Sequence, residues 1–221
     1  MHNSVDNLIG IQKEIQLKML ENKNLKKLPE IIAVSKTFTM ENIIPLINHG
    51  HLHFGENKVQ ESIEKWANIK TDFNHLNLHM IGKLQTNKVK HAVSLFDYIH
   101  SVDNFRLAEK ISNEQQKQNK KIKIFIQVNI GDEDKKNGIL ISDAEKFYQK
   151  CTKHLNLNIV GFMCIPPNDN NVHLNFSKMR DFITQTGLKE LSMGMSNDYL
   201  EAVEFESTYL RIGSKIFGKR N

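Results

Sequence analysis

Short apolar runs alternate with amphipathic segments along nearly the whole chain. An amphipathic helix is expected at about residues 3–26, and eight apolar runs that predict buried β-strands follow it. The runs are EIIAVSK (30–36), LHFGE (52–56), LHMIG (78–82), YIHSVD (98–103), KIFIQVNI (123–130), NIVGFMCI (158–165), ELSMGMS (190–196) and YLRIG (209–213). Each run precedes a segment with helical periodicity or a helical turn.

The helical segments fix the spacing between the predicted strands. They are expected at 40–49, 57–69, 85–96, 104–118, 142–154, 172–186, 197–206 and 214–218. Ser142 suits an N-cap because Glu145 follows three positions later, as in a capping box.

Strands that alternate with helices predict parallel pairing through right-handed crossovers. Eight such units predict an α/β fold, a single TIM (β/α)8 barrel with an additional N-terminal helix, in one domain spanning residues 1–221. A doubly wound open sheet is the alternative, but it would need edge strands of weaker apolar character.

Composition narrows the class of protein. The chain has 221 residues, of which 39% are hydrophobic, and no apolar run approaches the roughly 18 residues that span a membrane. The start is polar and helical, unlike a signal peptide, and Cys151 and Cys164 form no CxxC pair. We therefore expect a cytoplasmic protein without membrane contact. The net charge of +5 raises a nucleic-acid hypothesis, but no helix-turn-helix, zinc-finger or RNP-like motif accompanies it, so no nucleic-acid partner is expected.

Candidate chemistry gathers at the predicted carboxyl ends of the strands, where TIM barrels carry their active sites. The polar or small residues there are Lys36, Glu56, Asn57, Gly82, Asp103, Asn129, Pro166, Pro167, Ser192, Ser196, Arg211, Gly213 and Ser214. Lysine is almost never fully buried without a partner, although Lys36 could simply reach water beyond its strand.

The last two strand ends predict a phosphate site. TIM barrels often hold phosphate after strands 7 and 8, and N–H groups at a helix N-terminus bind anions. SMGMSND carries Ser196, and RIGSKIFG carries Gly213 and Ser214. Either loop alone is equally well an ordinary turn; together they favour a phosphate cradle. With a strand-end lysine, the cradle suggests a Schiff base with a phosphorylated carbonyl compound, such as pyridoxal phosphate.

The chain also resembles a known family. Segments such as IIAVSKTFTMENI, HFGENKVQE, HMIGKLQTNK, FIQVNIGDEDKKNGI, LSMGMSNDYLEAV and STYLRIGSKIFGKR are similar to those of the YggS/PROSC pyridoxal phosphate homeostasis proteins, which have the barrel of the alanine racemase N-terminal domain. The resemblance implies pyridoxal 5′-phosphate on Lys36 as an internal aldimine. It also implies phosphate contacts from Ser196, Gly213 and Ser214, Arg211 at the pyridine nitrogen, and Asn57 beside the ring.

The resemblance favours a carrier of the cofactor, acting in its homeostasis and in amino-acid balance, over a catalyst. A cation opposite the ring nitrogen disfavours protonation of that nitrogen and so weakens the ring as an electron sink. We expect no catalytic residues, a monomer, and pyridoxal-phosphate-dependent apoenzymes as partners.

Two enzymes are the rivals. A racemase needs an acid or base on each face of its substrate, and racemases of this fold add a β domain that is not expected after the eighth unit here. A class I aldolase commonly places its lysine on a later strand.

A metal site is not expected. His49, His51 and His53 alternate in HGHLHF, but His49 and Gly50 are typical of a helix end, which would prevent a common face. Cys164 lies within an apolar run and is expected in the core. Trp66 is expected to pack its helix.

Overall fold

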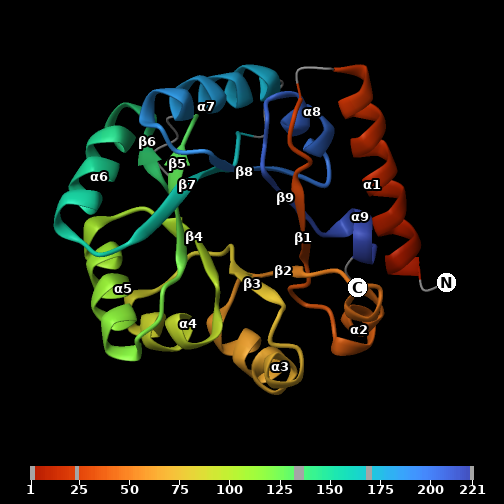
Figure 1. The fold of residues 1–221 in the computed structure, drawn as a ribbon, viewed down its shortest axis with the longest axis horizontal. Helices are drawn as coiled ribbons and strands as arrows, with labels where there is room; N and C mark the ends of the chain where they lie inside the picture. Colours follow the sequence, from red (N-terminus) through yellow and green to blue (C-terminus); the bar gives the residue numbers. More distant parts are fainter. Residues whose placement is uncertain (1–2, 23–24, 132–136, 168–170, 220–221) are drawn as a thin grey trace.

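The computed structural model describes residues 3–22, 25–131, 137–167 and 171–219. Within these ranges, eight parallel strands close into a barrel surrounded by helices (Figure 1). The fold is therefore the predicted TIM barrel. Its strands are β1 (Glu30–Val34), β2 (His53–Glu56), β3 (Asn77–Met80), β4 (Tyr98–Val102), β5 (Lys123–Asn129), β7 (Asn158–Cys164), β8 (Glu190–Met195) and β9 (Tyr209–Ile212).

The barrel closes between the first and last of these strands. β1 pairs with β2 on one side and with β9 on the other, and in the second pairing Ile32 is opposite Arg211. The short strand β6 (Ile139–Leu140) was not expected from the sequence. It pairs with the end of β5 outside the closed ring.

The helices agree closely with the expected segments. They are α1 (Asn3–Glu21), α2 (Met40–Asn48), α3 (Val59–Asp72), the 3₁₀ turn η1 (Thr86–Lys88), α4 (Val89–Leu95), α5 (Phe105–Gln118), α6 (Ile141–His154), α7 (Val172–Thr186), α8 (Tyr199–Glu204) and α9 (Ser214–Phe217). α1 ends earlier than expected and packs outside the barrel against α2, α8 and α9.

The expected N-cap at Ser142 is wrong. α6 begins at Ile141, directly after β6, and Leu140 occupies the N-cap position. The pairing of β6 with β5 carries the chain straight into the helix, so that Ser142 lies inside the first turn rather than before it.

Side chains alternate across the barrel wall, as the two-residue period of a strand requires. Outward-facing apolar side chains pack against the helices in the main core. The interior contains a second, smaller cluster of Ile32, Tyr98, Phe125, Met163 and Tyr209. Aromatic rings therefore fill much of the barrel's interior.

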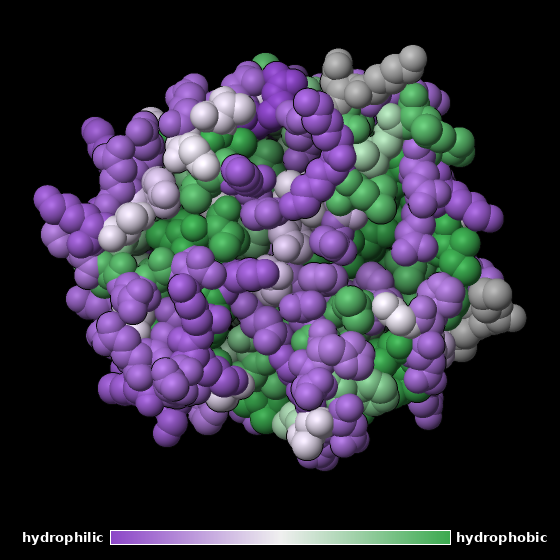
Figure 2. Space-filling model, viewed as in Figure 1, coloured by the Kyte–Doolittle hydropathy of each residue, from purple (hydrophilic) through white to green (hydrophobic). Residues whose placement is uncertain are grey.

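Polar side chains cover most of the face seen in Figure 2, with apolar patches between them. In the described part of the chain, no helix is both long enough and apolar enough to cross a bilayer.

Candidate functional site

A cavity of about 820 Å³ opens at the carboxyl ends of the strands, and we call it the mouth cavity. All six residues expected to bind a cofactor line it, namely Lys36, Asn57, Ser196, Arg211, Gly213 and Ser214. Other lining residues, which the sequence did not single out as binding residues, include Lys83, Gln127, Asn137, Ile165, Asp198 and Glu201. The expected strand-end residues Asp103 and Asn129 are not among those that line it.

Lys36 reaches this cavity because of the alternation along β1. Ile32 lies in the interior cluster and Val34 lines the cavity, so Lys36, two residues further on, faces inward as well. Ser35 between them is fully buried on the opposite side, where α3 covers the strand. Lys36 therefore faces the cavity, while the residues on either side of it, Ser35 and Thr37, are held by contacts on the outside of the barrel wall.

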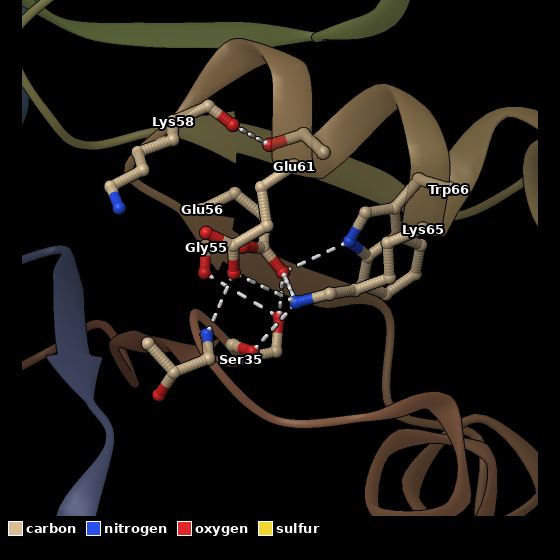
Figure 3. Close-up of polar contacts among 9 residues, drawn as sticks. Ser35, Gly55, Glu56, Lys58, Glu61, Lys65 and Trp66 are labelled. Carbon is tan, nitrogen blue, oxygen red and sulfur yellow. Dashed lines mark hydrogen bonds and ion pairs between the residues drawn. The ribbon is translucent and has the colours of Figure 1, made fainter.

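The first anchor is a buried carboxylate. Glu56 is fully buried, and its Oε1 accepts hydrogen bonds from Ser35 Oγ (2.8 Å), Lys65 Nζ (2.9 Å) and Trp66 Nε1 (3.0 Å) (Figure 3). Lys65 Nζ also donates to the main-chain oxygen of Ser35 at 3.0 Å. The residue before Lys36 is therefore held by both side chain and backbone.

The second anchor holds the residue after Lys36. Thr37 has a φ of 70°, which is strained for a β-branched residue. Its N–H donates to Glu61 Oε1 at 2.9 Å. Glu61 and Lys65 belong to α3, so one helix fixes the backbone on both sides of Lys36 (Figure 3).

Arg211 forms the floor of the mouth cavity. It is 5% exposed, and it donates from NH1 to Ser192 Oγ (2.7 Å) and from NH2 to the main-chain oxygen of Cys164 (2.9 Å). In the described part of the chain it is hydrogen-bonded to no carboxylate. Burial lowers the pKa of Arg211, while Cys164 and Asp198 oppose that shift.

The two serine loops meet across the cavity. Ser196 Oγ accepts from the N–H of Gly213 at 3.2 Å and, more weakly, from that of Lys215 at 3.4 Å. Ser214 is the first residue of α9, and Gly213 its N-cap, as the sequence predicts. The structure thus brings together hydroxyls and N–H groups from strands β8 and β9, a donor set typical of anion sites.

Asn57 follows β2 and lines the opposite wall. Its Oδ1 is buried without a hydrogen-bond partner among the described residues. The backbone of Gly82 lies against it so closely that a Cβ on Gly82 would stand 2.3 Å from the Asn57 main-chain oxygen. Only glycine at 82 leaves Asn57 in this place.

The other sequence candidates have different places. His49 is exposed, and His51 Nε2 contacts the main-chain oxygen of His53 at 2.9 Å, so these side chains do not converge. No group of three metal-ligating side chains occurs within the described ranges.

Cys164 is buried in the core, where burial raises its thiol pKa to about 12. Trp66 packs its helix as expected and, in addition, donates to Glu56.

Sequence and structure comparisons agree on one family. The family model for the alanine racemase N-terminal domain matches residues 16–221. The chain is 32% identical to the pyridoxal phosphate homeostasis protein of Pasteurella multocida, covering 97% of both chains, and 33% identical to that of Aquifex aeolicus, covering 99% of both.

Solved structures give the same result. PipY of Synechococcus elongatus with PLP bound is 32% identical, with a TM-score of 0.81 over 92% of this chain and 100% of that chain. Alanine racemase of Clostridium difficile shares the fold at a TM-score of 0.69 and 14% identity, over 94% of this chain and 57% of that one.

Proposed function

Since this chain belongs to the family of pyridoxal phosphate homeostasis proteins (YggS/PROSC), whose barrel is the alanine racemase N-terminal domain, we propose that it binds pyridoxal 5′-phosphate reversibly in the mouth cavity. One observation carries the proposal: an inward lysine and two loops whose serine hydroxyls and N–H groups converge line the same cavity. The protein then serves the intracellular balance of this cofactor and of amino acids.

The residues present fit the cofactor. Pyridoxal phosphate carries an aldehyde, a phosphate and a pyridine ring, and the mouth cavity offers an amine, a cluster of hydroxyl and N–H donors, and a guanidinium. Its volume of about 820 Å³ lies within the usual range of small-molecule sites, about 300–1,000 Å³. Asn57 Oδ1, an acceptor without a partner among the described residues, is available to a ligand donor.

Each residue then has a distinct task. Lys36 supplies the amine for a Schiff base with the aldehyde, and α3 holds its backbone in place. Ser196, Gly213 and Ser214 hold the phosphate. Arg211 faces the ring nitrogen, and Asn57 contacts the ring from the side.

Arg211 supports a carrier rather than a catalyst. When bound, the cofactor supplies an electron-withdrawing ring that is strongest when its nitrogen is protonated. A buried guanidinium disfavours that protonation. We therefore propose that the protein holds and releases the cofactor, that pyridoxal-phosphate-dependent apoenzymes receive it, and that the protein works as a monomer. Its two cysteines are free and buried, which suits a reducing cytoplasm.

The first experiment follows the cofactor itself. Purified protein incubated with pyridoxal phosphate should absorb near ~420 nm, the expectation for a protein-bound Schiff base, and borohydride should trap the cofactor on Lys36. Lys36→Ala should lose the trapped adduct and keep its fold, because a side chain beyond the strand end adds little to the core. A colourless wild type, or an adduct mapped to Lys58, Lys83 or Lys215, would overturn the assignment.

The second experiment separates a carrier from a racemase. The loaded wild type is incubated with a panel of L-amino acids while chirality and keto-acid release are followed. We expect turnover far below the roughly 1–1,000 per second of ordinary enzymes. Turnover in that range with any substrate, lost in Lys36→Ala, would establish a catalyst instead.

A further inference from the structure

A chain of hydrogen bonds runs through the interior of the barrel and ends at Arg211. His53 Nδ1 lies 2.9 Å from His79 Nε2, His79 Nδ1 lies 2.9 Å from His100 Nε2, and His100 Nδ1 lies 2.9 Å from Ser192 Oγ. Ser192 Oγ in turn accepts from Arg211 at 2.7 Å. We call His53, His79, His100 and Ser192 the interior column.

The interior column crosses the barrel from one end to the other. His53 is the first residue of β2, near Glu30 at the start of β1, whereas Arg211 lies in the floor of the mouth cavity. His79, His100 and Ser192 are 0% exposed, and His53 is 9% exposed. Buried imidazoles ordinarily bond to the main chain or to water; here they bond to one another.

The two ends of the column set its direction. A guanidinium can only donate, so Ser192 Oγ accepts from Arg211. The hydroxyl proton of Ser192 can then be donated to His100 Nδ1, and this is the direction that we assign. By the same rule His100 Nε2–H donates to His79, and His79 Nε2–H donates to His53. The last donor, His53 Nε2–H, points toward Glu30 Oε2, 3.8 Å away.

This direction matters for the buried charge. Every acceptor nitrogen of the column faces toward Arg211, so the imidazole dipoles offer it their negative ends. A buried cation is costly unless it is compensated, and no carboxylate bonds to Arg211 in the described ranges. We infer that the interior column positions Arg211 and stabilises its charge through the negative ends of the imidazole dipoles. A guanidinium that is hydrogen-bonded to no carboxylate in the described ranges then faces the mouth cavity, where Asp198 acts on it through its charge alone.

Packing keeps the rings in register. His79 stacks on Tyr98 with ring centroids 4.1 Å apart, and His100 stacks on Phe125 at 4.3 Å. Burial lowers the pKa of His79 and that of His100, so both rings are neutral at pH 7. A neutral imidazole has one donor and one acceptor nitrogen, which is what an unbroken one-way column needs.

Protonation at the far end should reverse the column. Burial lowers the pKa of His53 most strongly; Glu30 and Asp97 raise it, and Lys123 lowers it. His51 and the rings of Tyr98 and Tyr209 complete its surroundings. An imidazolium donates from both nitrogens, so His79 and then His100 must change tautomer. Ser192 Oγ would then accept from both His100 and Arg211. The imidazole dipoles would turn their positive ends toward Arg211, which would weaken the hold on the guanidinium.

This inference rests on the proposed function for its purpose, but it can be tested without the cofactor. Cofactor-free protein labelled with ¹⁵N in histidine and arginine is studied by NMR at pH 7. We expect neutral Nε2–H tautomers for His53, His79 and His100, and separate Arg211 Nη signals that indicate a guanidinium held in place. An Nδ1–H tautomer at His100, or a freely rotating Arg211, would overturn the inference.

Three variants sharpen the test. Ser192→Ala should average the Arg211 signals and weaken pyridoxal phosphate about tenfold, the effect of one lost hydrogen bond to a charged group. Ser101→Ala, a matched buried serine on β4 whose Oγ has no partner among the described residues, should change neither. His100→Phe keeps a ring against Phe125 without its nitrogens and should behave like Ser192→Ala. Equal effects of Ser192→Ala and Ser101→Ala would show that Ser192 contributes only to packing and does not position Arg211.

The pH dependence of the Arg211 signals is a further test, because a purely packing role of the column predicts no such dependence. The fixed Arg211 signals of the wild type should be lost as the pH falls through the pKa of His53, which burial places below 6.5. In His53→Gln the Gln oxygen can still accept from His79 but the site cannot titrate, so the signals should persist to lower pH. Identical pH profiles would contradict the inference. A wild type with fixed Arg211 signals that takes up no pyridoxal phosphate would support the column and refute the proposed function.

Discussion

Lys65 Nζ lies 3.0 Å from the main-chain oxygen of Ser35, the residue directly before Lys36. The same ammonium lies 2.9 Å from Glu56 Oε1. A cation on the outside of the barrel wall therefore fixes the backbone of a lysine that faces the inside. The position of Lys36 depends on a residue that never contacts the mouth cavity.

The first prediction concerns this contact. Lys65→Met leaves the buried Glu56 carboxylate without its cation, which should lower the free energy of unfolding by about 3 kcal/mol. It should also slow Schiff-base formation at Lys36, because the main-chain oxygen of Ser35 loses the donor that fixes it. Urea unfolding and stopped-flow absorbance measure the two effects. Lys58→Met, an exposed lysine just before the same helix, should change stability by less than about 0.5 kcal/mol.

The partner variant tests whether the loss comes from an unpaired charge. Glu56→Gln combined with Lys65→Met removes both charges and keeps acceptors for Ser35 and Trp66. The double variant should therefore be less destabilised than the sum of the single variants. Strictly additive losses would contradict a coupled pair.

A second prediction concerns the phosphate. Ser196→Ala with Ser214→Ala should weaken pyridoxal phosphate about a hundredfold, since each hydrogen bond to a charged group is worth about 1.5–3 kcal/mol. Pyridoxal, which lacks the phosphate, should lose little affinity. Titration by absorbance compares the two ligands, with Ser177→Ala, at a half-buried serine that does not line the mouth cavity, as control. Equal losses for both ligands would assign these hydroxyls to the fold rather than to the phosphate.

A third prediction uses the close approach of Gly82 to Asn57. A Cβ on Gly82 would meet the Asn57 main-chain oxygen at 2.3 Å and its Cα at 2.7 Å, so the backbone has to move. Gly82→Ala should lower the free energy of unfolding by about 2–4 kcal/mol and weaken cofactor binding. Gly10→Ala, at an open position inside α1, should instead stabilise by about 0.5–1 kcal/mol. A Gly82→Ala protein with wild-type melting and affinity would refute the contact.

The fourth prediction is a loss of stability in mild acid. Burial lowers the pKa of His51 to about 4 and also lowers that of His53, His79 and His100, compared with about 6.5 in the unfolded chain. Below pH ~6.5 the unfolded chain therefore binds more protons, and the free energy of unfolding falls as the pH falls. Each ring that stays neutral at pH 5 contributes a loss of about 2 kcal/mol.

Urea midpoints at several pH values between 5 and 8 measure this slope. His79→Phe should make the slope shallower, because one buried titrating group is removed. A substitution of the exposed His154 should leave it unchanged. A midpoint that stays constant from pH 7 to pH 5 would show that these rings are not held neutral.

The sequence predicted the barrel and the place of its mouth for a simple physical reason. Parallel strands end at one face, so residues after Val34 and Ile212 must meet there, however the loops fold. Alternation along a strand also separates neighbours: Asn57 turns into the cavity, whereas Glu56, grouped with it in the sequence, faces α3 and binds Lys65.

The interior column could not be predicted in this way. His53 is the first residue of its strand, whereas His79 and His100 are each the third of theirs, so their contact depends on the tilt and stagger of β2, β3 and β4. Only the register of the pairs, such as Gly55 opposite His79, brings their rings to hydrogen-bonding distance. Local sequence patterns carry no information about that stagger.

The pairing of β1 with β9 has a consequence for how the protein is made. Lys36 and Asn57 lie within the first 57 residues of the chain, whereas Ser196, Arg211 and Ser214 lie within the last 26. The two groups meet only across the β1–β9 seam. A ribosome-bound chain that has not yet released β9 has the lysine but no cradle. Cofactor binding therefore stabilises only the closed barrel. The time at which a growing chain begins to bind pyridoxal phosphate would show when the barrel closes.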